Sequence, residues 1–505
     1  MPPGEDDSHA VTSLTIIIAL VIILLSWLWN KSDDGIPTIN SYPWYLGQKR
    51  AHQEYLSNSR NLIKEGIKKF DGPFRIITAL GSRVIVPASY TEWLKNCLDL
   101  DHQALVHHEY FGGYPGMEGI GMVADPRNIV VDVTRKKLNQ SSPECKLMQE
   151  HIMESLEDIW GHDNVWDTVD WPQNAVSFIA RMSSAVFSGP ELSRDPEWQN
   201  LIITYTFNTF MGVRALRSYP SFLHPFARWL LPECRKCQAQ VRQARQILDP
   251  IIQSRNKTEG SSAKEEKAGV YNDTFQWLTD VAAGRPFDHA AAQLAFAVSA
   301  LHTTTELLKQ TLLDVCTHPE LIQPIRDEVT EAVSQDGWTT AGLFKMQLLD
   351  SVIKESQRLK PGLLVNLERK ALCDVTLPNG KKLPKGTNIA VDSSMMWDPE
   401  IYPDPTVYDG YRFLRLRQSG NGAAALVSTS RGHIAFGAGK SICPGRFFAA
   451  NEIKVALANI LMNYEVKIAG DHDPKVVEMG FEMLSDPEAK LMVRRHIKLI
   501  TLPDT

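Results

Sequence analysis

The sequence predicts a mostly helical fold of the α+β class. Seven segments carry apolar residues at the three- and four-residue spacing of amphipathic helices, whereas strand patterns are fewer and shorter. A chain of 505 residues, 43% hydrophobic and 22% charged, is long enough to bury the core that this fold needs. The expected helices cover residues 144–160, 196–215, 235–253, 288–317, 319–334, 345–359 and 445–464.

The expected strands form two hairpins and one closing strand. Residues 74–87 form one predicted β-hairpin, which turns around Gly81, and residues 374–391 form another near Asn379 and Gly380. The pattern LMVRRHIKLITL predicts a closing strand. The polar, low-complexity stretch 254–269 is expected to be a solvated loop between two helices.

The N-terminal segment contains an apolar run with the length of a membrane span. Residues 11–29 carry no charge and approach the ~20 residues that cross a bilayer as a helix. A cleaved signal peptide is the alternative, but the run is long, an acidic segment precedes it and no clear cleavage site follows. Lys and Arg occur after the span and not before it, so we expect the folded domain to face the cytosol. The predicted divisions are 1–10 in the lumen, 11–29 as the transmembrane anchor, 30–60 as a linker and the start of the folded domain, and 61–505 as that cytosolic domain.

The net charge and the cysteine content argue against a nucleic-acid-binding protein and against a secreted, disulfide-linked protein. A net charge of −6 gives no global attraction to nucleic acid. The seven cysteines are scattered and odd in number, which favours a reducing compartment over a secreted disulfide framework. Cys234 and Cys237 are spaced like half a zinc or redox site, but no second pair completes it, so we interpret them as incidental.

The segment FGAGKSICPG, residues 436–445, surrounds one cysteine with three glycines. Gly437, Gly439 and Gly445 permit tight turns and a close approach of backbone to a flat ligand. Pro444 suits the first turn of a helix, so Cys443 would lie at the positive end of a helix dipole, which favours the thiolate. A buried structural cysteine beside a glycine turn is the alternative at this point.

Two further segments supply a candidate charge network. Glu355 and Arg358 are three residues apart on a helical pattern, the spacing at which a carboxylate and a guanidinium meet. Alone, such a pair is most often a solvated surface pair. Arg412, in the aromatic and proline-rich segment PDPTVYDGYRF, is a second arginine that could complete a buried network with them.

Together these motifs resemble the cytochrome P450 family of haem-thiolate monooxygenases. Phe436, Gly439, Cys443 and Gly445 match the family pattern F-x-x-G-x-x-x-C-x-G. Glu355 and Arg358 resemble the family's E-x-x-R pair, and Arg412 resembles the arginine of its meander segment. The resemblance implies a cytochrome P450 fold in which Cys443 is the axial thiolate ligand of iron in haem b, and in which residues 61–505 are the catalytic domain.

The segment SALHTTTE, residues 299–306, resembles the family's oxygen-side helix motif A/G-G-x-D/E-T-T/S. Thr303 matches the alcohol that manages protons and water, while His302 stands where an acid is usual and Ala300 replaces the usual glycine. The resemblance implies catalytic roles for Thr303 and His302. Local hydrogen bonding of threonines to helix carbonyls is the alternative.

The resemblance also implies cations for the haem propionates. Arg369, His433 and Arg135 stand at matching positions, although each could be a solvated surface charge, and Lys136 or Lys137 could substitute for Arg135. Ser441 occupies a position that is often Arg or His in the family, so one contact is expected to be absent or supplied elsewhere.

Electrons must come from outside, because the chain contains no G-x-G-x-x-G dinucleotide fingerprint. The resemblance implies that NADPH reaches the enzyme indirectly, through NADPH-cytochrome P450 reductase, with cytochrome b5 as a second candidate donor. With the anchor, it implies a single-pass protein of the endoplasmic reticulum membrane. A basic patch that steers the acidic partner is expected from Lys136, Lys137, Lys440, Arg446 and Lys454.

The segments that resemble the family's substrate-facing regions are mostly apolar. They cover residues 107–122, 294–303, 361–368 and 480–484, and the aromatic stretch 219–232 is expected either to rest on the membrane or to be core. The chain looks most like fungal microsomal members related to ent-kaurene oxidase and indole-diterpene oxidases, which implies a terpenoid-type secondary metabolite as substrate. The alternatives are a haem-thiolate isomerase or dehydratase that needs no reductase, and a non-catalytic haem sensor.

Overall fold

The computed structural model describes residues 34–43, 47–140, 143–259 and 273–496. The predicted anchor, 11–29, lies outside these ranges. Among the helices within them, none combines the length and the apolar character that a membrane span requires. Helix α2 (Gly47–Lys69) spans the predicted end of the linker at residue 60 and packs on the first strand of the main sheet.

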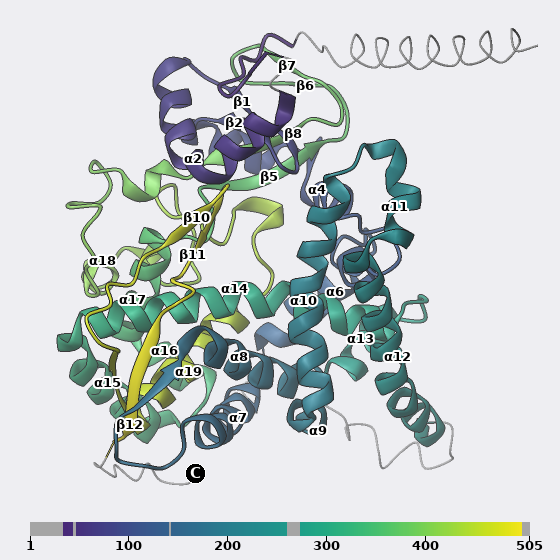
Figure 1. The fold of residues 1–505 in the computed structure, drawn as a ribbon. Coiled ribbons are helices and arrows are strands. Elements are labelled where there is room, and N and C mark those ends of the chain that lie inside the picture. The colour runs from purple at the N-terminus through teal and green to yellow at the C-terminus, as the bar shows by residue number, and fades with distance from the viewer. Residues whose placement is uncertain (1–33, 44–46, 141–142, 260–272, 497–505) are drawn as a thin grey trace, which may run out of the picture.

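One long helix, α14 (His289–Thr317), crosses the centre of the molecule (Figure 1). Asp288 caps its start by accepting a hydrogen bond from the Ala291 amide, which satisfies one of the free N–H groups of the first turn. Most of its side chains are buried, as expected for a helix surrounded by others. The helices that pack against it are α5 (Glu118–Val123), α8 (Trp171–Phe187), α10 (Pro196–Arg217), α12 (Pro232–Glu259), α17 (Gln347–Leu359) and α19 (Arg446–Asn463).

The other helices cover the outside of this bundle or the sheet. They are α3 (Thr91–Asn96), α4 (His102–Glu109), α6 (Ile129–Lys136), α7 (Pro143–Trp160), α9 (Pro190–Arg194), α11 (His224–Leu230), α13 (Thr274–Ala282), α15 (Ile322–Asp336), α16 (Thr340–Lys345) and α18 (Arg412–Gln418).

The helix predictions agree with the structure in all seven segments, but the structure contains further helices that were not predicted, among them α2, α6 and α13. The loop expected over 254–269 is wrong at its start, because α12 continues to Glu259. The pattern analysis also missed α8, a helix that is buried over most of its surface and therefore lacks a clear polar stripe. Asp170 caps α8 and Pro172 lies in its first turn, which is the local signal that was available.

The main sheet has five strands in the order β1-β2-β8-β5-β3. The predicted hairpin at 74–87 is present as antiparallel β1 and β2, with Gly81 at φ +113° in the turn. The second predicted hairpin is only partly right, because residues 388–392 form β8 of the main sheet, parallel to β2. The strands are β1 (Phe74–Thr78), β2 (Gly81–Val86), β3 (Leu100–Asp101), β5 (Val365–Ala371) and β8 (Asn388–Asp392), with β6 (Val375–Thr376) and β7 (Lys382–Leu383) as a separate small hairpin.

Two small sheets complete the fold. The predicted closing strand is β12 (Lys490–Arg495), which pairs with β4 (Asp167–Asp170) and β9 (Tyr464–Ile468). A hairpin of β10 (Val477–Met479) and β11 (Glu482–Leu484) lies against α2 and against the start of β5. The Leu364 amide donates to the Phe481 carbonyl at 2.8 Å, which fixes this hairpin beside the main sheet.

The hydrophobic core centres on α14, and two smaller clusters lie under the main sheet. Since α14 contacts both α17 and α19, the segments that carry the sequence motifs converge on one region of the molecule.

Candidate active site

The cysteine loop turns sharply just before α19. The Cys443 amide donates to the Phe436 carbonyl at 2.8 Å, which closes the loop. Gly437 and Gly439 have φ of +73° and +66°, in the region that favours glycine. A Cβ on Gly439 would lie 2.6 Å from the Lys95 carbonyl oxygen, so this position admits no side chain. Gly445 has an ordinary φ of −89° and is the N-cap of α19.

Burial and nearby hydrogen-bond donors shift the pKa of the Cys443 thiol in opposite directions. Burial raises the pKa of its thiol, while the Gly445 amide and the Arg446 guanidinium favour the thiolate. Helix α19 begins at Arg446, two residues after the predicted start at Pro444, so the sulfur still lies at its positive end. A metal cation bound to the sulfur would remove the proton outright. The loop therefore suits a sulfur ligand of a metal.

The structure brings Glu355, Arg358 and Arg412 together. Arg358 makes two hydrogen bonds of 2.8 Å to the Glu355 carboxylate, and Arg412 Nε makes a third at 3.0 Å. The Glu355 and Arg358 side chains have no exposed surface, so this is not a solvated pair. The remaining donors of both arginines bond to backbone carbonyls of the segment 396–407, which holds that irregular segment onto α17.

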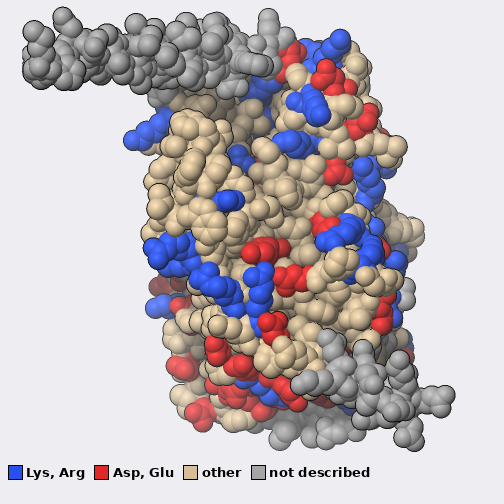
Figure 2. Space-filling view, turned by 90° about the vertical axis from the view of Figure 1, so that its right-hand side faces the viewer, with Lys and Arg blue, Asp and Glu red and all other residues tan. Residues whose placement is uncertain are grey.

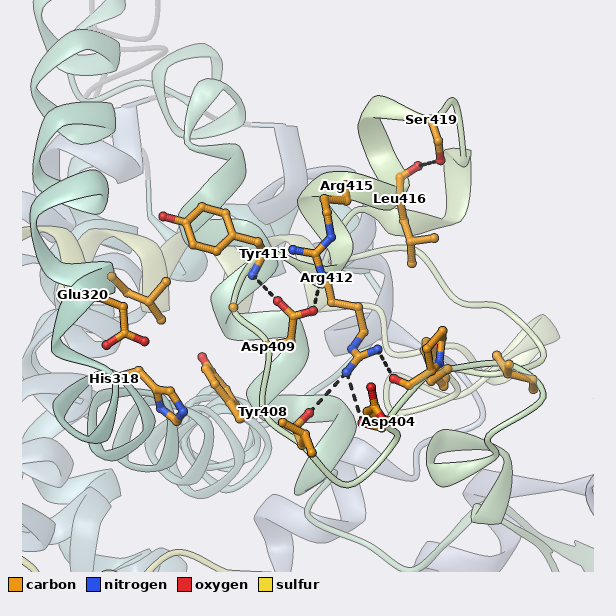
Figure 3. A pocket seen from close by; sticks show the side chains of 16 residues that line it. His318, Glu320, Asp404, Tyr408, Asp409, Tyr411, Arg412, Arg415, Leu416 and Ser419 are labelled. Carbon is orange, nitrogen blue, oxygen red and sulfur yellow. Dashed lines mark hydrogen bonds and ion pairs between the residues drawn. The ribbon is translucent and has the colours of Figure 1, made fainter.

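A surface hollow of about 680 Å³ lies beside this network. It is lined by residues of the segment 401–419 and by residues just after α14, including His318 and Tyr408 (Figure 3). His318 is fifteen residues beyond Thr303, ~22 Å along a helix. The hollow therefore belongs to the Arg412 segment and is separate from the motif on α14.

The middle of α14 carries accessible side chains in an otherwise buried helix. Ser299, His302 and Thr303 are exposed, whereas Leu301 and Thr304 beside them are buried. Desolvation nevertheless lowers the pKa of His302, opposed by the charge of Glu306. His302 therefore combines accessible surface with a ring that neighbouring protein atoms partly desolvate. Thr303 Oγ1 donates to the Ser299 carbonyl at 3.1 Å, so its lone pairs stay free to accept hydrogen bonds.

Arg369 on β5 is a buried cation that makes no ion pair with the residues that the structure describes. Only 3% of the residue is exposed, its Nη1 donates to the Glu368 carbonyl at 2.8 Å, and its Nη2 has no hydrogen-bond partner among the described residues. Desolvation lowers its pKa to about 10. A buried guanidinium with a free donor fits a carboxylate group of a bound ligand.

His433 and Arg135 are placed differently from Arg369. His433 is fully buried beside Phe413 and Lys354, and burial lowers its pKa far below the ordinary value, so the ring is neutral and supplies no cation. Its two ring nitrogens have no partner within the described part of the chain. Arg135 on α6 is exposed and donates to the Lys440 carbonyl at 3.2 Å, which places it beside the cysteine loop.

The basic patch expected near the loop is smaller than predicted. Lys454 is buried, lies 2.5 Å from Asp350 and donates to the Leu343 carbonyl, so its inclusion was wrong. Lys136 is exposed and pairs with Asp132 at 3.0 Å, and Lys440 is exposed. Arg446 is half-buried and donates to the Cys443 carbonyl at 3.0 Å, so the exposed cations near the loop are those of α6 together with Lys440.

His102 lies near Arg369 and was not predicted from the sequence. His102 on α4 bonds to the same Glu368 carbonyl, through Nδ1 at 3.0 Å. It lies 266 positions from Glu368 in the chain, and no local motif marks it. The pairing of β3 with β5 and the packing of α4 on β5 bring the two segments together.

These residues fit haem. Within the ranges that the structure describes, no group of three or more His, Cys, Asp and Glu side chains could hold a metal ion by itself. Haem would supply four nitrogens to a metal bound by Cys443, and it also carries two carboxylates that need partners. The free Nη2 of Arg369 matches one of these carboxylates, and the glycine loop admits a flat ring near the sulfur.

Comparisons with known proteins agree with this fit. The family model described as Cytochrome P450 matches residues 146–494. The chain is 37% identical to cytochrome P450 monooxygenase ntnM of a Nectria species, over 96% of this chain and 93% of that protein. It is 37% identical to cytochrome P450 monooxygenase adrA of Penicillium rubens, with 97% of each chain covered, and 38% identical to pyr3 of Aspergillus fumigatus, covering 99% of this chain and 96% of the relative. Cyanobacterial CYP120A1, solved with retinoic acid, has the same fold at a TM-score of 0.66 and 19% identity, covering 91% of this chain and 99% of that one.

Proposed function

The chain belongs to the cytochrome P450 family and is a monooxygenase, and we propose that it oxygenates a hydrophobic, terpenoid-type secondary metabolite with electrons from NADPH through a reductase. One atom of O2 would enter a C–H bond of the substrate as a hydroxyl group. The other would leave as water, with two electrons from NADPH and two protons. One contact carries the proposal: α19, which follows Cys443, packs on α14, where the Ser299–Thr303 stretch is accessible.

Different residues of the chain would bind haem and transfer protons. When bound, haem supplies an iron centre that activates O2, and a thiolate ligand makes that centre electron-rich. Cys443 would hold the iron and Arg369 a propionate, with Arg135 as a second, exposed cation near the loop. Thr303 would accept a hydrogen bond from a water molecule through its free lone pairs and hold it beside α14. His302, neutral because of desolvation, would pass a proton without keeping a permanent charge.

The membrane setting is part of the proposal. The segment 219–232 supports it, because Phe222, Phe226, Trp229 and Leu230 are all more than half exposed. Figure 2 shows a broad area of uncharged side chains on the upper left of the face that carries the right-hand helices of Figure 1. We propose that this surface rests on the endoplasmic reticulum membrane, with the anchor at 11–29, and that a hydrophobic substrate enters from the lipid. Lys136 and Lys440 would help to dock the reductase.

The test is expression of the full chain in microsomes, with and without reductase, followed by incubation with a terpenoid panel under ¹⁸O2. Monooxygenation predicts a product heavier by one ¹⁸O atom that forms only with reductase and NADPH. A product of unchanged mass, or one lighter by one water molecule, that forms without reductase would instead show the isomerase or dehydratase alternative. Neither product, with an intact thiolate-type haem spectrum, would favour the haem sensor.

A further inference from the structure

The accessible polar residues in the middle of α14 form one stripe along the helix. They are exposed or half-buried among buried neighbours, and they are Ser299, His302, Thr303 and Glu306. Their spacing of i, i+3, i+4 and i+7 places them on a single helical face. The stripe ends at Glu306, because Lys309, the next position on that face, is only 7% exposed. Glu306 is therefore the acidic end of the stripe that carries His302 and Thr303.

The Glu306 carboxylate is held from two sides. The amide and the hydroxyl of Ser485, which follows β11, donate to its Oε2 at 2.9 and 2.8 Å. Lys309 Nζ lies 2.5 Å from its Oε1. Ser485 is buried, and the Met483 amide before it donates to the Gly362 carbonyl at 2.8 Å, which fixes this segment beside the main sheet. The carboxylate therefore keeps one orientation, and Lys309 compensates its charge.

One acceptor position of this carboxylate stays open toward His302. Each carboxylate oxygen accepts about two hydrogen bonds. Oε2 takes both of its bonds from Ser485, whereas Oε1 meets only Lys309 within the described ranges. The His302 ring contacts the Phe210 ring, with centroids 5.8 Å apart, and forms neither a hydrogen bond nor an ion pair with the described residues. Residues four apart on a helix have Cβ atoms about 5–6 Å apart, so one water molecule can join Glu306 to His302.

The charges around the ring act in the same sense as this geometry. Desolvation lowers the pKa of His302, the charge of Glu306 raises it, and the charge of Lys309 lowers it. Of the neighbouring elements, β11 carries Glu482 and α10 carries Arg214, and these two act on each other. Glu306 is therefore the group that stabilises a proton passing through the His302 ring.

We propose that Glu306 is a positioning residue that orients His302, through one water molecule, for proton delivery to Thr303. The water donates one hydrogen to Glu306 Oε1 and the other to a ring nitrogen of His302. The second ring nitrogen then carries the N–H, because the hydrogen bond at one nitrogen sets the tautomer. It donates this proton toward the water at Thr303 and the ring regains one from the bridging water, so no electrons move. This inference rests on the proposed monooxygenase function and adds a residue to its proton supply.

The first measurement is the rate at which the haem-loaded full chain forms the ¹⁸O-labelled product with reductase and NADPH. Positioned proton transfer contributes about 100- to 10,000-fold to enzyme rates, and Glu306 would supply part of it, so Glu306→Gln should slow product formation about ten-fold. In a His302→Ala background, the same change should have no further effect, because the residue that Glu306 orients is gone. Effects of the two changes that multiply independently would overturn the proposal.

The second measurement needs no turnover. Deuterium exchange at C2 of the histidine rings, followed by mass spectrometry over a range of pH, gives the pKa of His302 in the haem-loaded full chain. Glu306→Gln removes the charge that raises this pKa and leaves Lys309 unpaired, so the pKa of His302 should fall. Glu306→Asp keeps the charge and should restore the wild-type value. An unchanged pKa of His302 in Glu306→Gln would overturn the proposal.

Two control variants separate this role from a purely structural one. Asp314→Asn removes an ion-paired carboxylate from the same helix, since Asp314 lies 2.7 Å from Lys360, and should keep both the rate and the pKa of His302. Ser485→Ala removes the hydroxyl bond but keeps the Glu306 charge, and should also keep that pKa. If Ser485→Ala slows product formation as much as Glu306→Gln does, Glu306 only anchors the segment after β11 and the proposal is wrong. Failure of the monooxygenase function would show separately, as absent ¹⁸O incorporation with the pKa change in Glu306→Gln intact.

Discussion

Arg358 donates two hydrogen bonds of 2.8 Å to the Glu355 carboxylate, and neither side chain has any exposed surface. Removing one partner of a buried pair leaves an uncompensated charge, which costs about 3–5 kcal/mol. We therefore expect Glu355→Gln to lower the free energy of unfolding by about that amount and to reduce haem incorporation. Urea unfolding followed by circular dichroism measures the change.

The control for this variant is Glu478→Gln, because Glu478 pairs with Arg60 at 2.6 Å but both side chains are about one-third exposed. Exposed pairs contribute less than about 1 kcal/mol. If Glu355→Gln costs no more than Glu478→Gln, the buried network does not stabilise the Arg412 segment.

Glu452 makes stability depend on pH. Ser183 donates to its Oε1 at 2.7 Å, its Oε2 has no partner among the described residues, and burial raises its pKa to about 8. The unfolded chain releases this proton near pH 4.5, whereas the folded chain keeps it to about pH 8. Between these values the folded state binds more protons, so the free energy of unfolding falls as pH rises, by at most about 1.4 kcal/mol per pH unit.

We expect Glu452→Gln, which keeps the acceptor for Ser183, to flatten this pH dependence between pH 5 and 8. Urea unfolding at pH 5.5, 6.5 and 7.5 measures it. Glu191→Gln, an exposed glutamate, is the control and should keep the wild-type slope. A slope that is the same in all three proteins would exclude Glu452 as its source.

Cys443→Ala should abolish the thiolate-type band in the carbon monoxide difference spectrum. Among the described cysteines, Cys443 alone lies in a loop shaped by left-handed glycines at the start of a helix. Cys373→Ala removes an exposed cysteine and should leave the band unchanged. Persistence of the band in Cys443→Ala would show that another residue binds the iron.

Contacts between residues close in the sequence were predictable, whereas contacts between distant segments were not. Glu355 and Arg358 were predictable because three-residue spacing on a helix brings their side chains together. Lys454 was misplaced on the surface because its partner, Asp350, lies on another helix. Arg369 was found only through the family resemblance, and His102 was missed, because pairing of distant strands creates their common site. Local sequence patterns predict helices and strands. Tertiary packing decides which charged side chains are buried, and local patterns do not show this.

Deleting residues 1–30 should leave haem incorporation intact. The deletion keeps Asp34, which pairs with Arg75 and accepts a hydrogen bond from the Ile36 amide, so the first contacts of the main sheet are retained. The carbon monoxide difference spectrum of the truncated protein, compared with that of the full chain, measures the result. If the truncated protein binds no haem under any solubilising condition, the first thirty residues are required for folding and are not only an anchor.

The last prediction concerns Thr303 and His302 on the accessible face of α14. Thr303 bonds to the Ser299 carbonyl and keeps its lone pairs free, so it can hold the water that delivers protons. We expect Thr303→Ala to divert reducing equivalents from product to peroxide. His302→Ala should slow turnover with less leakage, because a neutral ring passes protons that another water chain can also carry. NADPH consumed, peroxide released and product formed are measured for each variant.

Thr311→Ala is the matched control, because Thr311 on the same helix makes the same kind of bond, to the Leu307 carbonyl at 2.7 Å, but is fully buried. It removes a helix hydrogen bond without removing an accessible hydroxyl. If Thr303→Ala and Thr311→Ala couple NADPH to product equally well, the Thr303 hydroxyl serves helix packing only. Loss of coupling in Thr303→Ala alone would assign the proton path to this accessible stretch of α14.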